Sequence, residues 1–136
     1  MNGYLLDTHI LLWWIGEAQK LDRHVFSIIS NSANSIYVSS ASIWEIAIKE
    51  ALGKLKIDAD LENLIEMNSF LELKISAKCA SATRKLESIH RDPFDRILIT
   101  QAIENNLTLI TADKQIVKYS GVKLFFSQRK NIEIKD

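Results

Sequence analysis

Short apolar segments alternate with helix-length segments along this chain, and that alternation restricts its fold more than any other feature. Residues 3–6, 36–38, 70–73, 107–110 and 122–125 have the length and the apolar, often β-branched or aromatic, content of buried strands. Strands that alternate with helices predict βαβ units with right-handed crossovers. We therefore expect an α/β fold, a three-layer α/β/α sandwich around a mostly parallel five-stranded sheet.

Capping residues and apolar residues at helical spacing predict the helices between these strands. The expected helices cover approximately residues 10–15, 22–31, 41–52, 61–65, 76–86, 94–104 and 114–119. Asp22 and Ser76 are expected N-caps, and Gly16 and Gly53 are expected to end the helices that precede them. Pro93 suits a first helical turn because its φ is fixed and it has no amide proton.

Composition limits the number of domains, the charge and the cellular compartment that we expect for this protein. A chain of 136 residues fits one domain, expected to span residues 1–136, and its 17 basic and 17 acidic residues leave no net charge. Nucleic-acid binding must then depend on local patches. Cys79 is the only cysteine, which excludes an intrachain disulfide and favours a reducing compartment. With no apolar run long enough to cross a membrane and no signal peptide, we expect a cytoplasmic protein.

Four acidic residues are expected at one edge of the sheet. Asp7 ends the first strand, Asp113 follows the fourth, and Glu45 lies one turn into the helix that leaves the second. Asp95 lies in the first turn of the helix that enters the fourth strand, and such a helix runs antiparallel to its strand. All four side chains therefore start from the edge where strands end, which is where ligands bind in sheets of this kind.

Such a gathering of carboxylates favours a bound cation. Two unit charges ~4 Å apart repel by about 4 kcal/mol at an effective dielectric near 20. The acids must then take up protons or share an ion. Hard divalent cations prefer oxygen ligands, and such an ion lowers the pKa of bound water and offsets charge on phosphorus. The pattern suits hydrolysis of a phosphodiester without a histidine base.

Each acid also has an ordinary structural interpretation. Asp7 can be a turn residue at a strand end, Asp113 an N-cap, and Glu45 a solvated helix residue, although its neighbours are mostly apolar. Acidic residues such as Asp95 are common in first turns. Asp92, which precedes Pro93, is expected to be a cap or turn residue rather than a ligand.

Several neighbouring polar residues are candidates for support. Thr8 and Thr111 can each hydrogen-bond a carboxylate or cap the backbone locally, and Ser39 has the same two options with the cap favoured. Arg96 can contact a phosphate or pair with an acid on the surface. The three histidines lack zinc-like spacing, and of the adjacent Trp13 and Trp14 one is expected in the core and the other at a partner contact.

Four segments resemble the signature blocks of one family. LLDTH at 5–9, SSASIWEI at 39–46, RDPFDR at 91–96 and LITAD at 109–113 are similar, in order and spacing, to those of PIN-domain ribonucleases, most of all the VapC-type toxins of bacterial type II toxin–antitoxin pairs. The resemblance implies an α/β/α sandwich and a metal-dependent endoribonuclease that cuts single-stranded RNA. It assigns Asp7, Glu45, Asp95 and Asp113 as the residues that bind Mg²⁺ or Mn²⁺ and carry catalysis.

The same resemblance implies a homodimer and a cognate antitoxin protein that binds the acidic groove. Water is expected to attack phosphorus in line, leaving a 5′-phosphate and a 3′-hydroxyl, so the RNA 2′-hydroxyl is not the nucleophile. Three alternatives stay open: a PIN nuclease of RNA processing, a non-catalytic interaction domain and a phospho-acceptor signalling domain. The last needs an aspartate after the third strand, where Leu73 is followed by Lys74.

Overall fold

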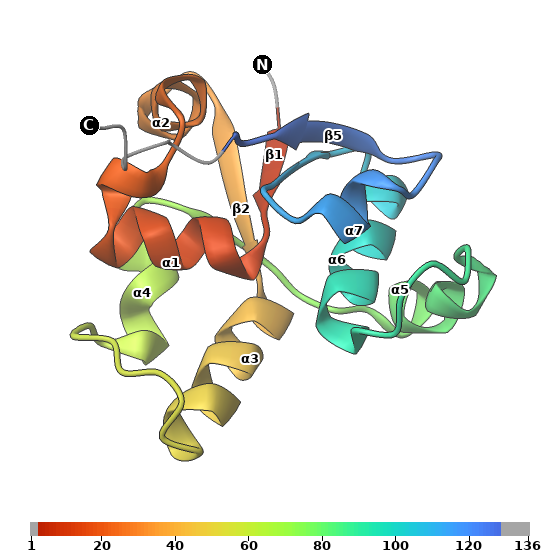
Figure 1. Ribbon diagram of the computed structural model, residues 1–136, viewed down its shortest axis with the longest axis horizontal. Helices are drawn as coiled ribbons and strands as arrows, with labels where there is room; N and C mark the ends of the chain where they lie inside the picture. The colour runs from red at the N-terminus through yellow and green to blue at the C-terminus, as the bar shows by residue number, and fades with distance from the viewer. Residues whose placement is uncertain (1–2, 129–136) are drawn as a thin grey trace, which may run out of the picture.

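The five predicted strands form one sheet in which every neighbouring pair is parallel. The computed structural model describes residues 3–128, and the residues after Gln128, which are mostly polar in the sequence, lie outside them. The strands are β1 (Gly3–Leu6), β2 (Ser35–Ser39), β3 (Leu71–Leu73), β4 (Thr108–Thr111) and β5 (Lys123–Phe126). Their order is β3-β2-β1-β4-β5, so β1 lies at the centre. This confirms the predicted fold class (Figure 1).

Helices connect the strands on both sides of the sheet. They are α1 (Thr8–Gly16), α2 (Arg23–Ser30), α3 (Ser40–Ala51), α4 (Leu64–Met67), α5 (Ala77–Ala82), α6 (Pro93–Glu104) and α7 (Lys114–Val117). Short 3₁₀ segments cover Ala18–Lys20, Leu61–Asn63 and Thr83–Lys85. Within residues 3–128, none of the helices is long and apolar enough to cross a membrane.

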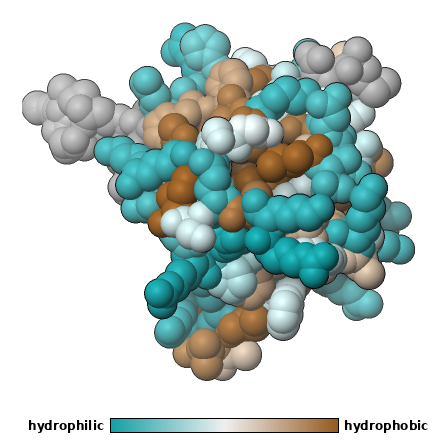
Figure 2. All heavy atoms as spheres, turned by 90° about the vertical axis from the view of Figure 1, so that its right-hand side faces the viewer, coloured by the Kyte–Doolittle hydropathy of each residue, from teal (hydrophilic) through white to brown (hydrophobic). Residues whose placement is uncertain are grey.

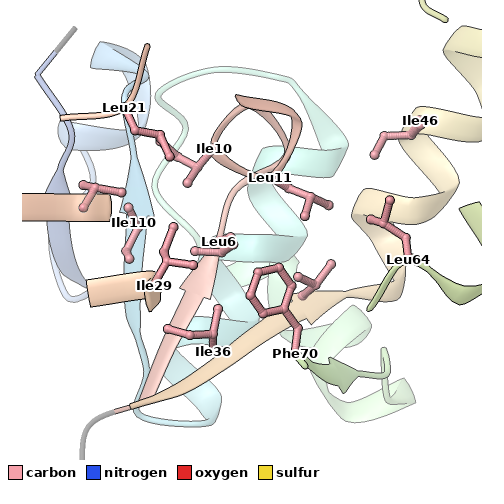
Figure 3. Close-up of a cluster of buried hydrophobic side chains, with 12 residues drawn as sticks. Leu6, Ile10, Leu11, Leu21, Ile29, Ile36, Ile46, Leu64, Phe70 and Ile110 are labelled. Atoms are coloured by element: carbon pink, nitrogen blue, oxygen red, sulfur yellow. The ribbon is translucent and has the colours of Figure 1, made fainter. Parts of the chain in front are cut away.

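Alternate side chains of the central strands enter two separate cores. Leu6 and Ile110 point into a cluster with residues of α1, α2, α3 and α4, and Figure 3 shows these side chains converging on one face of the sheet. Leu5 and Leu109 point to the opposite face and pack with Leu98, which lies on α6. Because successive strand residues face opposite sides, burial on both faces explains the continuous apolar runs in the sequence.

The side chains and backbone at helix ends explain where the helices begin and stop. The carboxylates of Asp22 and Asp92 accept hydrogen bonds from the first free amides of α2 and α6, and the Ser76 hydroxyl does so for α5. Gly53, just past α3, has a φ of 72°, which glycine adopts without steric cost. Pro93 occupies the first turn of α6. These observations confirm the predicted caps.

The helix expected over residues 76–86 is shorter than predicted. It ends at Ala82 and tightens into the 3₁₀ segment. The Thr83 carbonyl accepts from the Leu86 amide at 3.2 Å and from Arg96 Nη2, also at 3.2 Å, so it is not available to continue an α-helical ladder. A long-range contact from α6, which no local pattern reveals, sets this end.

The sheet register places three polar residues side by side where the central strands end. Leu6 is opposite Val38 of β2 and Ile110 of β4, so the next residues, Asp7, Ser39 and Thr111, are neighbours. The Asp7 amide donates to the Ile110 carbonyl at 3.0 Å, which holds this alignment. In Figure 1 the first turns of α1 and α3 lie near the centre of the view, close to the end of β1, and α6 begins to their right.

Candidate metal centre

Asp7 is fixed at the middle of this edge by two contacts. It caps α1, with Oδ1 accepting from the Ile10 amide at 2.8 Å, while Oδ2 accepts from the Thr111 hydroxyl. The sequence did not identify Asp7 as a helix cap. The side chain is buried, with 3% of its residue surface exposed. Both oxygens are therefore held in place before any ligand binds.

The surroundings of Asp7 oppose its ionisation. Burial raises the pKa of this carboxyl from 3.8 to about 6, and the charges of Asp113 and Glu45 act in the same direction. The hydrogen bonds from Thr111 and the Ile10 amide lower the pKa in part. The carboxylates of Asp113 and Glu45 are thus close enough to Asp7 for their charges to raise its pKa.

Thr111 connects Asp7 to Asp113. Its hydroxyl donates to the Asp7 carboxylate and accepts from the Asp113 amide at 3.0 Å. The Asp113 side chain caps α7, with Oδ1 accepting from the Gln115 amide at 2.8 Å. The carboxylate contact considered for Thr111 is therefore present. Thr8 instead donates to Ser42 at 3.0 Å, and Ser39 accepts from the Ala41 amide as the cap of α3.

Glu45 is a buried acid with one oxygen in an ion pair and one oxygen that has no hydrogen-bond partner among the described residues. Oε2 lies 3.1 Å from Lys49 Nζ, one turn further along α3. Oε1 is buried and has no hydrogen-bond partner among the described residues. An unpartnered carboxylate oxygen in a buried position costs free energy. This oxygen therefore suits a ligand that donates a hydrogen bond or carries positive charge.

Asp95 faces His90, a histidine that no sequence pattern connects with it. Its Oδ2 lies 3.1 Å from His90 Nε2. Burial raises the pKa of Asp95 to about 6, the contact with His90 lowers it, and the charges of Asp92, Asp7 and Asp113 raise it further. Asp92 is the cap that the sequence predicts, since its Oδ1 accepts from the Phe94 and Asp95 amides.

The described hydrogen bonds of Arg96 go to backbone carbonyls and a hydroxyl rather than to an acid. Its guanidinium donates to the carbonyls of Glu87 at 2.8 Å and Thr83 at 3.2 Å, and to the Tyr119 hydroxyl at 2.9 Å. Tyr119 in turn lies 2.8 Å from Nδ1 of His90. Arg96 therefore holds the segment that carries His90, and its effect on Asp95 is indirect.

The donor chemistry of this edge fits a divalent cation, although the acids are not drawn together into a finished site. The charge of Asp113 raises the pKa of both Asp7 and Asp95. Glu45 Oε1, which has no hydrogen-bond partner among the described residues, is available to a ligand. Among residues 3–128, no three His, Cys, Asp or Glu side chains are close enough to form a metal-binding group. Lys49 contacts Oε2 of Glu45, and His90 contacts Oδ2 of Asp95. A cation at Glu45 Oε1 would leave Lys49 in place, whereas coordination by Asp95 Oδ2 would displace His90.

Comparison with known proteins places the fold and these blocks in a family. The sequence profile of the PIN domain matches residues 4–122. The chain belongs to the PIN domain family. This PIN domain is 28% identical over 120 residues to Ribonuclease VapC22 of Mycobacterium tuberculosis (strain ATCC 25618 / H37Rv), a match that covers 85% of this chain and 91% of that protein.

Solved structures share the fold of this PIN domain. In VapBC2 from Rickettsia felis, bound to a DNA fragment from their promoter, one chain aligns with a TM-score of 0.69 and 19% identity, covering 93% of this chain and 99% of that one. In DNA-bound VapBC from Salmonella typhimurium the values are 0.64 and 16%, covering 93% and 98%. The chain thus matches nearly the full length of both.

Proposed function

We propose that this PIN domain is a divalent-cation-dependent endoribonuclease and the toxin of a toxin–antitoxin pair. The likeness to Ribonuclease VapC22 supports the ribonuclease activity. The observation that carries the metal proposal is the buried edge itself: burial and the charges of Asp113 and Glu45 raise the pKa of Asp7, and Glu45 Oε1 has no hydrogen-bond partner among residues 3–128. A divalent cation would satisfy that oxygen and favour the ionised form of Asp7.

Asp7, Glu45, Asp95 and Asp113 would hold Mg²⁺ or Mn²⁺. When bound, such an ion would contact phosphate oxygens and offset the charge that develops on phosphorus. The chain itself orients the ligands: the Thr111 hydroxyl and the Ile10 amide hold Asp7, and the Gln115 amide holds Asp113. This arrangement leaves little reorganisation for the time of reaction.

A basic hollow beside the acids suits the RNA backbone. A cavity of about 460 Å³ is lined by Ser88, Ile89, His90, Arg91 and Arg96, next to the contact between His90 and Asp95. Arg91 is exposed, and no hydrogen bond or ion pair to another described residue holds it. Its guanidinium can therefore contact a phosphate of a bound strand.

Cleavage of single-stranded RNA with Mg²⁺ or Mn²⁺ tests the proposal. The wild type should cut, and either Asp7→Asn or excess chelator should abolish cutting. Glu72→Gln, which changes an exposed acid on β3, is the matched control and should cut normally. A 2′-deoxy substitution at the scissile position should permit cleavage, because water rather than the 2′-hydroxyl is the expected nucleophile. Cleavage that survives both Asp7→Asn and chelator would refute the metal mechanism.

The toxin role has a separate test. VapBC complexes share this fold, which supports a cognate antitoxin as the partner. The neighbouring reading frame should encode a small DNA-binding protein that copurifies with this chain and suppresses its RNA cleavage. Absence of such a frame would favour the alternative, a PIN nuclease of RNA processing. The homodimer stays a prediction, and light scattering of the purified chain would measure it.

A further inference from the structure

A small aromatic cavity adjoins the acidic edge on the side of α1. It has a volume of about 250 Å³ and is lined by His9, Trp13, Ala112 and Asp113. Asp113 is one of the candidate ligands, so the cavity and the proposed metal centre share a wall. The other wall comes from α1, where His9 and Trp13 are four residues apart and hence on the same helix face.

His9 and Trp13 present their rings to the cavity, whereas the neighbouring Trp14 packs against other aromatic residues. The ring centroids of His9 and Trp13 are 6.0 Å apart, with planes inclined at 50°. His9 is exposed, and Trp13 is half-buried with one side against the core. Trp14 turns the other way, against Phe26 and Phe70, and its Nε1 donates to Asn68. Trp13 therefore keeps aromatic surface at the cavity, while Trp14 serves packing.

We propose that this cavity is a nucleobase subsite, in which Trp13 and His9 stack one base of the RNA next to the scissile phosphate. The inference rests on the proposed function. Unpaired bases are recognised by stacking on aromatic and histidine rings. The cavity is smaller than the roughly 300–1,000 Å³ of sites for larger ligands, so it suits a single base.

The charges around the cavity favour a neutral base over a phosphate. Asp113 contributes a carboxylate to the wall, and among residues 3–128 no lysine or arginine lines the cavity. A phosphate placed there would be repelled, whereas a base is uncharged. The backbone of the same strand would instead follow the acidic edge, where a cation would offset its charge, towards Arg91 in the hollow that His90, the partner of Asp95, also lines.

The test reads stacking directly, independently of cleavage. Single-stranded RNA carries one 2-aminopurine at successive positions and binds in an Asp95→Asn background with Mg²⁺, which keeps the RNA intact. We expect quenching at one position beside the cut mapped with the wild type. Trp13→Leu, which retains apolar volume against the core, should abolish that quenching and weaken binding roughly 5- to 100-fold. Trp13→Phe should restore both, and His9→Ala should weaken both without lowering the melting temperature.

Phe26→Leu is the matched control, since Phe26 is a partly exposed aromatic residue that contacts Trp14 and not the cavity. It should leave the quenching unchanged. Equal quenching with and without Trp13→Leu in the Asp95→Asn background, when the wild type cleaves RNA, would overturn the base subsite alone. Quenching that depends on Trp13 without any RNA cleavage would support the subsite and refute the nuclease. No RNA binding by the wild type would overturn both.

Discussion

The buried carboxyl of Asp7 links the stability of the protein to its proposed chemistry. Burial and neighbouring charges raise its pKa to about 6, whereas in the unfolded chain the pKa is near 3.8. The native state therefore binds more protons than the unfolded state between these two pH values. It follows that the contribution of Asp7 to stability is present at low pH and is lost as pH rises through 6.

Asp7→Asn should therefore stabilise the metal-free protein at neutral pH. The full pKa shift corresponds to about 3 kcal/mol, and we expect roughly 2 kcal/mol in the free energy of unfolding at pH 7.5. The gain should shrink towards pH 4, where the wild-type carboxyl is protonated. Urea titrations in chelator across this range measure it. A stability difference of the same size at pH 4 and pH 7.5 would contradict the assignment.

Thr111→Val tests the hydroxyl that joins two of the acids. Loss of its hydrogen bond should raise the pKa of Asp7 further, moving the acid limb of the pH–rate profile to higher pH. Loss of this support should also lower metal affinity or activity by about 10- to 100-fold. Thr8→Val is the matched control, because that buried hydroxyl bonds Ser42 rather than an acid. Similar pH–rate profiles for the two variants would argue against the role of Thr111.

At the scale of single residues, the sequence predicts where the four acids lie, but it does not predict most of the side chains that contact them. Asp7, Glu45, Asp95 and Asp113 can be placed at one edge from strand and helix order alone. The contact of Lys49 with Glu45 follows helical i,i+4 spacing and could have been predicted from the sequence. His90 reaches Asp95 from an irregular segment with no period, so only the folded chain reveals that pair.

At the level of elements, α6 carries the clearest local signal and one of the candidate ligands. Asp92 caps it through the Phe94 and Asp95 amides. Asp92→Ala should cost about 1 kcal/mol of stability, while Asp92→Asn, which keeps a capping oxygen, should cost less. Both should retain RNA cleavage, since Asp92 is expected to be a cap and not a ligand. Denaturant unfolding and cleavage assays on the pair check this, and loss of cleavage in Asp92→Asn would assign Asp92 a direct role.

Element boundaries followed local chemistry wherever a cap or a proline was present. The starts of α2, α5 and α6 agree with the predicted caps. The end of α5 does not, because Arg96, thirteen residues later, uses the Thr83 carbonyl. Figure 2 shows the side of the molecule that faces right in Figure 1, where α5, α6 and α7 lie, and hydrophilic side chains there surround smaller apolar patches. Leu98 of α6 and Ile116 of α7 are buried in the core, whereas Ile103 and Val117 on the same helices are exposed.

On the scale of the whole molecule, the central position of β1 is what gathers the acids. Because β2 and β4 flank β1 in parallel, the connections leaving all three strands start from one edge. The sequence alone predicts strands and crossovers, but the order β3-β2-β1-β4-β5 is a property of the folded chain. If β1 were an outer strand of the sheet, Asp7 would be separated from Ser39 or from Thr111.

Because the acids come from connections far apart in the sequence, a shared cation should stabilise the entire fold. At pH 7.5, Mg²⁺ at about 100 times its dissociation constant should add roughly 2.7 kcal/mol to the free energy of unfolding and raise the melting temperature by several degrees. At pH 5 the gain should fall, since Asp7 and Asp95, with pKa values raised to about 6, are then mostly protonated. Thermal unfolding with and without Mg²⁺ measures both. Asp7→Asn should remove the gain and Glu72→Gln should keep it, so an equal Mg²⁺ effect in these two variants would place the cation elsewhere.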